Sequence, residues 1–131
     1  MQVVYPIDIE DALRIDLAAL DSDYRFLCPP IPSDLKAGDV LITRVGGSRV
    51  SGASSDYDVS IDCYAADEAD AVKMTNNVHG LVSSLPLRDT STQFSASNAN
   101  LPYSNHDPRA EQLARQTFRA TLTCPGTRIN F

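Results

Sequence analysis

Residues 44–71, RVGGSRVSGASSDYDVSIDCYAADEADA, decide the fold that we expect for this chain. The stretch starts as the end of an apolar strand and passes through Gly and Ser. It then continues as a strand in which Tyr57, Val59, Ile61 and Cys63 alternate with polar residues. A period of two is typical of a strand with one buried face. We therefore predict a hairpin of two strands with a deformable Gly/Ser tip.

A second helix is predicted directly after this hairpin. The acids Asp67, Glu68 and Asp70 suit its first turn, because carboxylates interact favourably with a helix N-terminus. Apolar residues then recur at spacings of three and four until Pro86 ends the pattern; they are Ala71, Met74, Val78, Leu81 and Leu85.

The C-terminal third is predicted to hold a loop and one strand. Residues 88–108 are rich in Ser, Asn and Thr, which favours a long polar loop with at most one short strand near 93–97. Residues 115–124 alternate again and predict a half-buried strand, which Pro125-Gly126 should end.

Before the hairpin we expect a helix, an edge segment and a strand. Asp8 can cap a helix over 8–20, whose apolar positions have helical spacing; they are Ile9, Leu13, Leu17 and Leu20. Residues 24–34 contain three prolines, which favours an extended path along a sheet edge. Residues 40–45 have the β-branched content of a strand.

These elements predict a single domain over residues 1–131 of the α+β class. We expect a small, mostly antiparallel sheet of about four or five strands with two helices packed on one face, since this arrangement buries every apolar stripe. A chain of 131 residues is long enough for one core without metals or disulfides.

Composition excludes several classes of protein. No apolar run approaches the roughly 20 residues of a membrane helix, and the N-terminus lacks a secretory signal, so the expected compartment is the cytosol. Three cysteines without a CxxC pair favour reduced thiols over disulfides or structural zinc.

The charge of the chain is acidic and unevenly distributed. A net charge of -6 disfavours binding to the nucleic-acid backbone. Residues 1–23 carry a balance of -5 and residues 109–131 a balance of +3. This asymmetry could steer one subunit's N-terminal region toward a neighbour's C-terminal region.

No catalytic, cofactor-binding or metal site is predicted, and we expect the protein not to be an enzyme. His79 and His106 are the first catalytic candidates, because histidine is the usual general acid or base near neutral pH, but neither has a recognisable partner in the sequence. Cys63 should point inward. Asp58 and Asp62 are about 13 Å apart along one strand face, too far to act as a carboxylate pair.

Gly46-Gly47-Ser48 follows a strand but lacks the spacing of GxxxxGK[ST] or GxGxxG, and no helix comes after it. Nucleotide binding is therefore not expected.

The central part of the sequence resembles that of a known protein family. A strand ending LITRVGG at 41–47, a Gly/Ser-rich turn, the strand DVSIDCYAA at 58–66 and an acidic helix start are similar to the tail terminator (tail completion) proteins of long-tailed bacteriophages, especially those of actinobacterial hosts. The opening acidic helix, CPPIP at 28–32 and FRATLTC at 118–124 extend the resemblance over most of the chain. The long polar loop at 88–108 departs from it.

This resemblance implies a structural protein without cofactors. It would form a homo-oligomer, a hexameric ring, on the end of the tail tube, contact the tail tube protein, end tube polymerisation and present a surface to the head-completion (stopper) protein. Genomic DNA would pass through the lumen without specific binding. The protein would be located in the tail or neck of the virion, after assembly in the host cytoplasm.

Two other functions stay open. One is a head–tail connector or stopper of the phage neck, and the other is a small cytosolic ligand-binding or hydrolytic domain that uses His79 and a nearby acid. For a ring protein we predict a subunit or tube contact at or near five residues of the hairpin, the alternative being a mobile exposed tip; they are Arg44, Gly46, Gly47, Arg49 and Tyr57.

Overall fold

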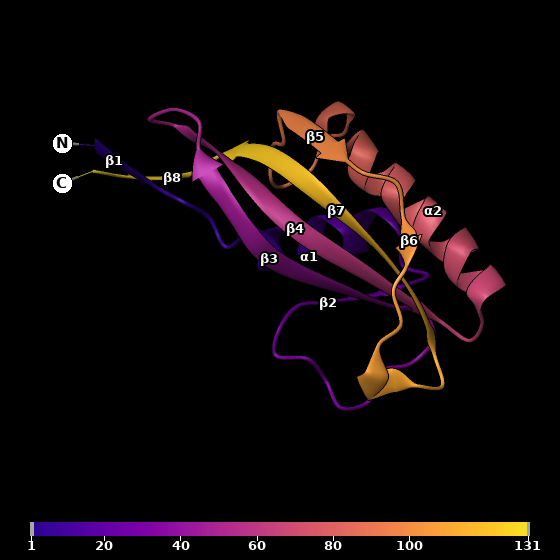
Figure 1. The fold of residues 1–131 in the computed structure, drawn as a ribbon. Coiled ribbons are helices and arrows are strands. Elements are labelled where there is room, and N and C mark those ends of the chain that lie inside the picture. Colours follow the sequence, from indigo (N-terminus) through magenta and orange to yellow (C-terminus); the bar gives the residue numbers. More distant parts are fainter. Residues whose placement is uncertain (1, 131) are drawn as a thin grey trace.

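The strands β3 (Asp39–Arg49) and β4 (Ser54–Ala65) form the centre of the fold in a computed structural model that describes residues 2–130 (Figure 1). β4 lies between β3 and β7 (Ala114–Pro125) and is antiparallel to both. Its odd-numbered residues from 57 to 65 are buried beneath the helices, as the period of two predicts.

Short strands complete the main sheet at both edges. β2 (Arg25–Leu27) runs parallel to the start of β3, and β5 (Ala96–Ala99) pairs with β7 on the far edge. β6 (Tyr103–Ser104) pairs with the other end of β7. The result is a mixed six-stranded sheet in the order β2-β3-β4-β7-β5, with β6 also on β7.

Both predicted helices are confirmed, α1 over Ile9–Leu20 and α2 over Glu68–Ser84. Asp8 caps α1 by accepting a hydrogen bond from the Asp11 N–H, and Asp67 caps α2 in the same way. At its C-terminal end α2 passes into the 3₁₀ turn η1 (Leu85–Leu87), where Pro86 stops the helix.

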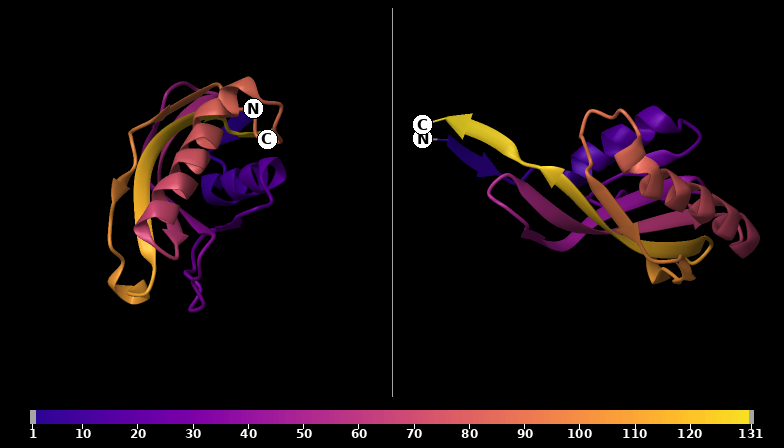
Figure 2. Two further views of the ribbon diagram at one scale, coloured as in Figure 1. Left: turned by 90° about the vertical axis from the view of Figure 1, so that its right-hand side faces the viewer. Right: turned by 90° about the horizontal axis from the view of Figure 1, so that it is seen from above.

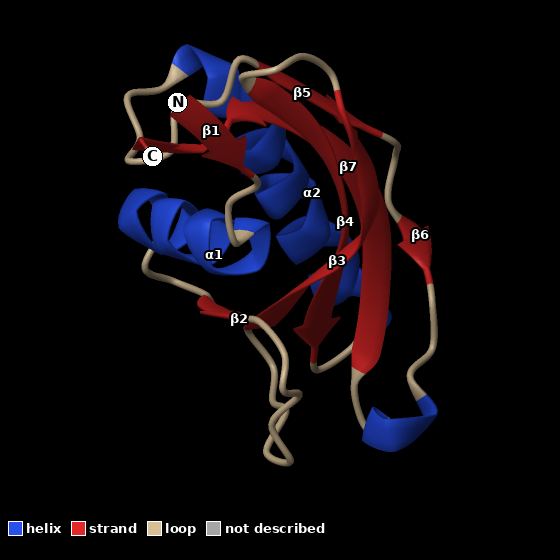
Figure 3. Cartoon of the chain, turned by 90° about the vertical axis from the view of Figure 1, so that its left-hand side faces the viewer, coloured by secondary structure: helices blue, strands red, loops and turns tan. Residues whose placement is uncertain are grey.

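One face of the sheet carries both helices, and the other face is open (Figure 3). α1 contacts β2 and β3, while α2 contacts β4, β5 and β7. The buried apolar residues form one continuous cluster between helices and sheet; the largest of them are Phe118, Ile9, Leu13, Leu17, Ile42, Ile61, Leu85 and Leu122. This packing follows from the helical and strand periods together.

The chain ends form a second sheet. β1 (Gln2–Tyr5) pairs antiparallel with β8 (Thr127–Asn130), so that Gln2 lies opposite Asn130. This pair, which we call the arm, projects from the body beyond the tip of β3 and β4 (Figure 2).

The expected fold class was wrong in the number of strands. The described residues form eight strands in two sheets, instead of one sheet of about four or five. β1, β6 and β8 were not predicted, and β5 overlaps the region 93–97 where at most one short strand was expected. These four strands are two to four residues long, and none alternates apolar and polar residues as β4 does. A period cannot be recognised over so few residues, and their partners lie far away in the sequence.

Two boundaries were also wrong. The Gly/Ser segment is mostly strand, since β3 continues through Gly46 and Gly47 to Arg49 and only residues 50–53 form the turn. The long polar loop at 88–108 contains β5 and β6 where at most one short strand was expected, and it leads into the 3₁₀ turn η2 (Pro108–Ala110).

Candidate functional site

All five residues that the sequence singles out line one groove. It lies beside the outer end of β3 and β4, where Pro6 of the chain entering α1 forms the opposite side, and it encloses about 370 Å³. The predicted residues in it are Arg44, Gly46, Gly47, Arg49 and Tyr57. The hairpin thus brings together what the sequence spreads over fourteen positions, and we call this the hairpin groove.

Gly47 is indispensable to the backbone of this groove. Its φ angle is +147°, and a Cβ atom at this position would overlap the carbonyl oxygen of Asp56 on β4. Only glycine tolerates both conditions. The pairing of β3 with β4 also shifts between Arg44 and Gly46, which leaves Val45 unpaired in a bulge.

Two of the five residues hold the arm in place. Tyr57 is 4% exposed, and its hydroxyl accepts a hydrogen bond of 2.9 Å from the N–H of Ile7. Nη2 of Arg49 donates to the carbonyl oxygen of Val4 at 2.8 Å. These bonds tie the N-terminal strand to the hairpin, so Tyr57 acts from beneath the surface and not as an exposed contact residue.

Arg44 is the free cation of the hairpin groove. Its backbone N–H donates to a carboxylate oxygen of Glu10 at 2.8 Å, which satisfies one polar group on the open edge of β3. Its side chain is exposed and makes no ion pair with the part of the chain that the structure describes. It is therefore available to a partner.

The edge of β3 beyond Leu41 is open. β2 pairs only with Asp39–Leu41, and no other described strand lies on that side of β3. An open edge with unpaired N–H and C=O groups can add a strand from another chain. Arg44 and the two glycines of the hairpin groove belong to this part of β3.

Three carboxylates of β4 lie on the open face of the sheet, where Arg119 of β7 lies opposite Ser60, between Asp58 and Asp62. Asp58 and Asp62 share this face as predicted, and each accepts a hydrogen bond from a β7 threonine, at 2.7 Å from Thr121 and 2.6 Å from Thr117. Asp56 has the same kind of partner in Thr123. The carboxylates are paired with hydroxyls across two strands, and not with one another.

The candidate catalytic residues do not form a constellation. His79 packs edge-on against Phe118 with ring centroids 5.1 Å apart, and no described residue hydrogen-bonds to its buried Nε2. Burial raises the pKa of the Cys63 thiol to about 12, which makes the thiol a poor nucleophile. His106 is exposed, and its carbonyl oxygen accepts from Arg115.

Sequence reasoning missed three buried carboxylates. Asp16 accepts a hydrogen bond from the N–H of Thr92, and the other two are Asp39 and Asp107. Both lie at the end of the sheet remote from the arm, and each accepts hydrogen bonds from an arginine. Asp107 precedes Pro108, a pattern typical of the start of a helical turn, and it caps η2 as that pattern predicts. The pattern does not reveal that the carboxylate is buried.

Neither a protein-family model nor a curated protein matches the sequence. Among residues 2–130, no group of three or more His, Cys, Asp or Glu side chains is placed to hold a metal ion. No helix in the described part of the chain has the length and apolarity to cross a membrane.

Proposed function

We propose that this chain is a structural protein of a long-tailed phage that forms a ring on the end of the tail tube, stops tube growth and joins the tail to the head. The observation that carries the proposal is the gathering of the five predicted contact residues in the hairpin groove, next to a strand whose outer edge is open beyond Leu41. Such an edge can receive a strand of a neighbouring subunit.

The arm supports the same proposal. It projects from the body and has two free edges, and a two-stranded sheet of this size is only marginally stable alone in water. Tyr5 and Ile129 of the arm are 41% and 42% exposed. A neighbouring chain or the tube would cover these apolar side chains.

The open face of the sheet suits a surface turned toward DNA. Its carboxylates on β4 would repel phosphates, so a lumen lined by this face would let DNA pass without binding. A map of the assembled ring with a basic lumen would contradict this part of the proposal.

The test is the capping of preformed tail tubes by the purified protein. We expect the wild-type chain to bind tube ends and to stop their elongation by added tube protein, as counted by electron microscopy. Arg44→Ala should lower this activity about tenfold, since it removes the free cation of the groove. Lys73→Ala, an exposed substitution on α2, is the matched control and should cap like the wild type.

Other outcomes decide between the alternatives. Binding to portal-side components without binding to tubes would identify a stopper and contradict the proposal. A hydrolytic activity that His79→Ala abolishes would instead favour the small enzyme.

A further inference from the structure

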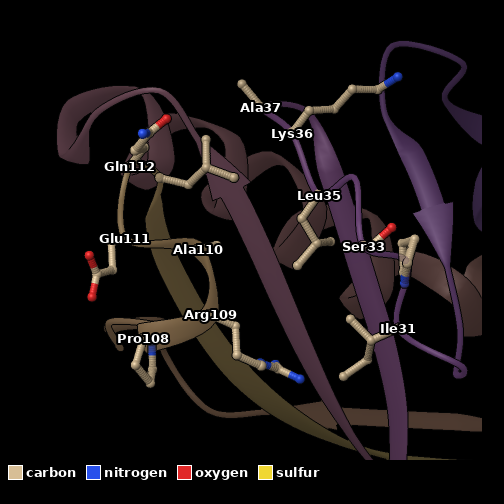
Figure 4. A pocket seen from close by; sticks show the side chains of 12 residues that line it. Ile31, Ser33, Leu35, Lys36, Ala37, Pro108, Arg109, Ala110, Glu111 and Gln112 are labelled. Atoms are coloured by element: carbon tan, nitrogen blue, oxygen red, sulfur yellow. The ribbon is translucent and has the colours of Figure 1, made fainter.

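A second and larger recess lies at the end of the molecule remote from the arm. It encloses about 790 Å³ between the loop 31–37, which follows β2, and the segment 108–113, which contains η2 (Figure 4). We call this recess the cleft. Its lining includes the apolar side chains Ile31, Leu35 and Leu113, the cations Lys36 and Arg109, and the carboxylate Glu111.

A buried carboxylate holds the first wall of the cleft. Asp39 is 0% exposed and accepts hydrogen bonds from Arg25 Nη2 at 2.6 Å and from the backbone N–H of Lys36 at 3.0 Å. Both carboxylate oxygens of Asp39 therefore accept a hydrogen bond from the guanidinium of Arg25. The loop is tied to the sheet at the point where it turns back into β3.

A second buried carboxylate holds the opposite wall. Asp107 is 1% exposed and accepts from the hydroxyl of Tyr64 at 2.7 Å and from Nε and Nη2 of Arg109 at 3.1 Å each. The paired bonds fix the plane of the guanidinium. The Arg109 side chain remains 53% exposed and extends toward Ile31 on the facing wall, while Glu111 points away (Figure 4).

The cleft is therefore a preformed recess that combines apolar side chains with polar ones, Ser33 and Gln112 among them, and with the fixed guanidinium of Arg109. The oxygens of its two buried acids already hold its own walls, so few convergent polar groups remain to orient a small molecule. An apolar surface with a basic rim matches a polypeptide that carries apolar and acidic side chains.

The outer face of α1 has this chemistry. Ile15 is 46% exposed at the middle of the helix, and Ala18 and Ala19 beside it are exposed as well. Acids flank this apolar patch at both ends of the helix; they are Asp8 and Asp11 on one side and Asp21 and Asp23 on the other. Arg14, which pairs with Asp11, is the one basic residue of α1.

We propose that the cleft of one copy of this chain receives the outer face of α1 of the next copy. Apolar Ile15 would meet Ile31 and its neighbours, small Ala18 and Ala19 would permit close approach, and the flanking acids would face Arg109 and Lys36. No α1 residue lines the cleft of its own chain among the described residues. The contact joins two different surfaces, so repeated head to tail around a closed rotation it yields a ring.

This contact rests on the proposed function in one respect, because it supplies the subunit interface of the ring. Head-to-tail association can nevertheless be measured without tail tubes.

The experiment measures the mass of the full-length chain by light scattering after size exclusion. The wild type should assemble, and more weakly as salt is added. Ile15→Lys, which disables the helix face, and Ile31→Asp, which disables the cleft, should each raise the dissociation constant about tenfold or more. Both positions are exposed, so circular dichroism should report an unchanged fold.

Mixing the two variants is the decisive step. The mixture retains one intact helix face and one intact cleft, so it should form a one-to-one heterodimer that does not grow further. A contact between identical surfaces would give no heterodimer, because each chain would still carry a defect at that surface. Val72→Asp on α2 is the matched control: Val72 is 42% exposed, lies outside both proposed surfaces, and its substitution should leave assembly like that of the wild type.

The proposal is overturned if the wild type stays monomeric at about 1 mM. It is also overturned if Ile15→Lys assembles normally, or if Ile129→Asp alone abolishes assembly, since the arm would then be the contact. Tube capping that survives Ile15→Lys would reject this interface and leave the ring function standing. If the two variants form the heterodimer but the wild type never caps tail tubes, this interface would stand and the proposed ring function would be rejected.

Discussion

Gly47 shows how one residue shapes the candidate site. A side chain there would meet the backbone of β4, and its φ of +147° lies outside the range that other residues favour. The close approach of β3 and β4 at the hairpin groove therefore depends on the missing Cβ atom.

We predict that Gly47→Ala lowers the free energy of unfolding by about 1–3 kcal/mol, because the substitution adds both a clash and backbone strain. Urea denaturation measures the change. Gly52→Ala in the turn is the control, since a Cβ atom there has no neighbour within 4 Å and its φ is not in the strained range. An equal decrease in the free energy of unfolding in the two variants would contradict the requirement for glycine at position 47.

At the scale of elements, η2 depends on one carboxylate. The hydrogen bonds from Arg109 hold the pKa of Asp107 well below its usual range, despite the opposing effect of burial. A carboxyl whose folded pKa is depressed stabilises the fold fully above its unfolded pKa of about 3.9, and this stabilisation is lost as the pH falls below that value.

We predict that Asp107→Asn lowers the free energy of unfolding by about 2–4 kcal/mol at pH 7, since it leaves Arg109 and Arg115 without their buried partner. The difference from the wild type should shrink as the pH falls below about 4. Denaturant titrations at several pH values across that range measure whether the stability difference between the wild type and the variant shrinks or grows as the pH falls. Asp23→Asn, at an exposed position, should change stability by no more than about 0.5 kcal/mol at pH 7.

At the scale of the whole molecule, one core joins the helices to the main sheet. Cys63 on β4 and Cys124 on β7 are both 0% exposed within it, and burial raises their pKa values to about 12 and about 11. Cys28, beyond β2, is only half-buried.

We predict that one thiol per native chain reacts rapidly with an aromatic disulfide reagent at pH 8, and that all three react after unfolding in guanidinium. The absorbance of the released thiolate gives the count. Cys28→Ser should remove the rapid phase and leave the other two thiols protected. Three rapid thiols in the native chain would contradict a single tight core.

The chemistry at the residue scale was accessible from the sequence only where it is local. The cap Asp8 was predicted correctly, because a capping residue bonds to an N–H three positions ahead. Asp67 was expected within the first turn of α2, and it caps that helix instead. The five residues predicted as a contact line one groove, because they lie close together in the hairpin. Asp39 and Asp107 were missed, since their burial depends on loops that fold back over the sheet.

Local sequence is sufficient for α1, α2, β4 and β7, because each carries a helical or strand period long enough to recognise. Tertiary structure alone decides the strand order, the pairing of Gln2 with Asn130, the attachment of β5 and β6 to β7 and the two walls of the cleft. These features join segments that are far apart in the chain. Their free energy comes from contacts that no window of sequence contains, which is why they become visible only once the chain has folded.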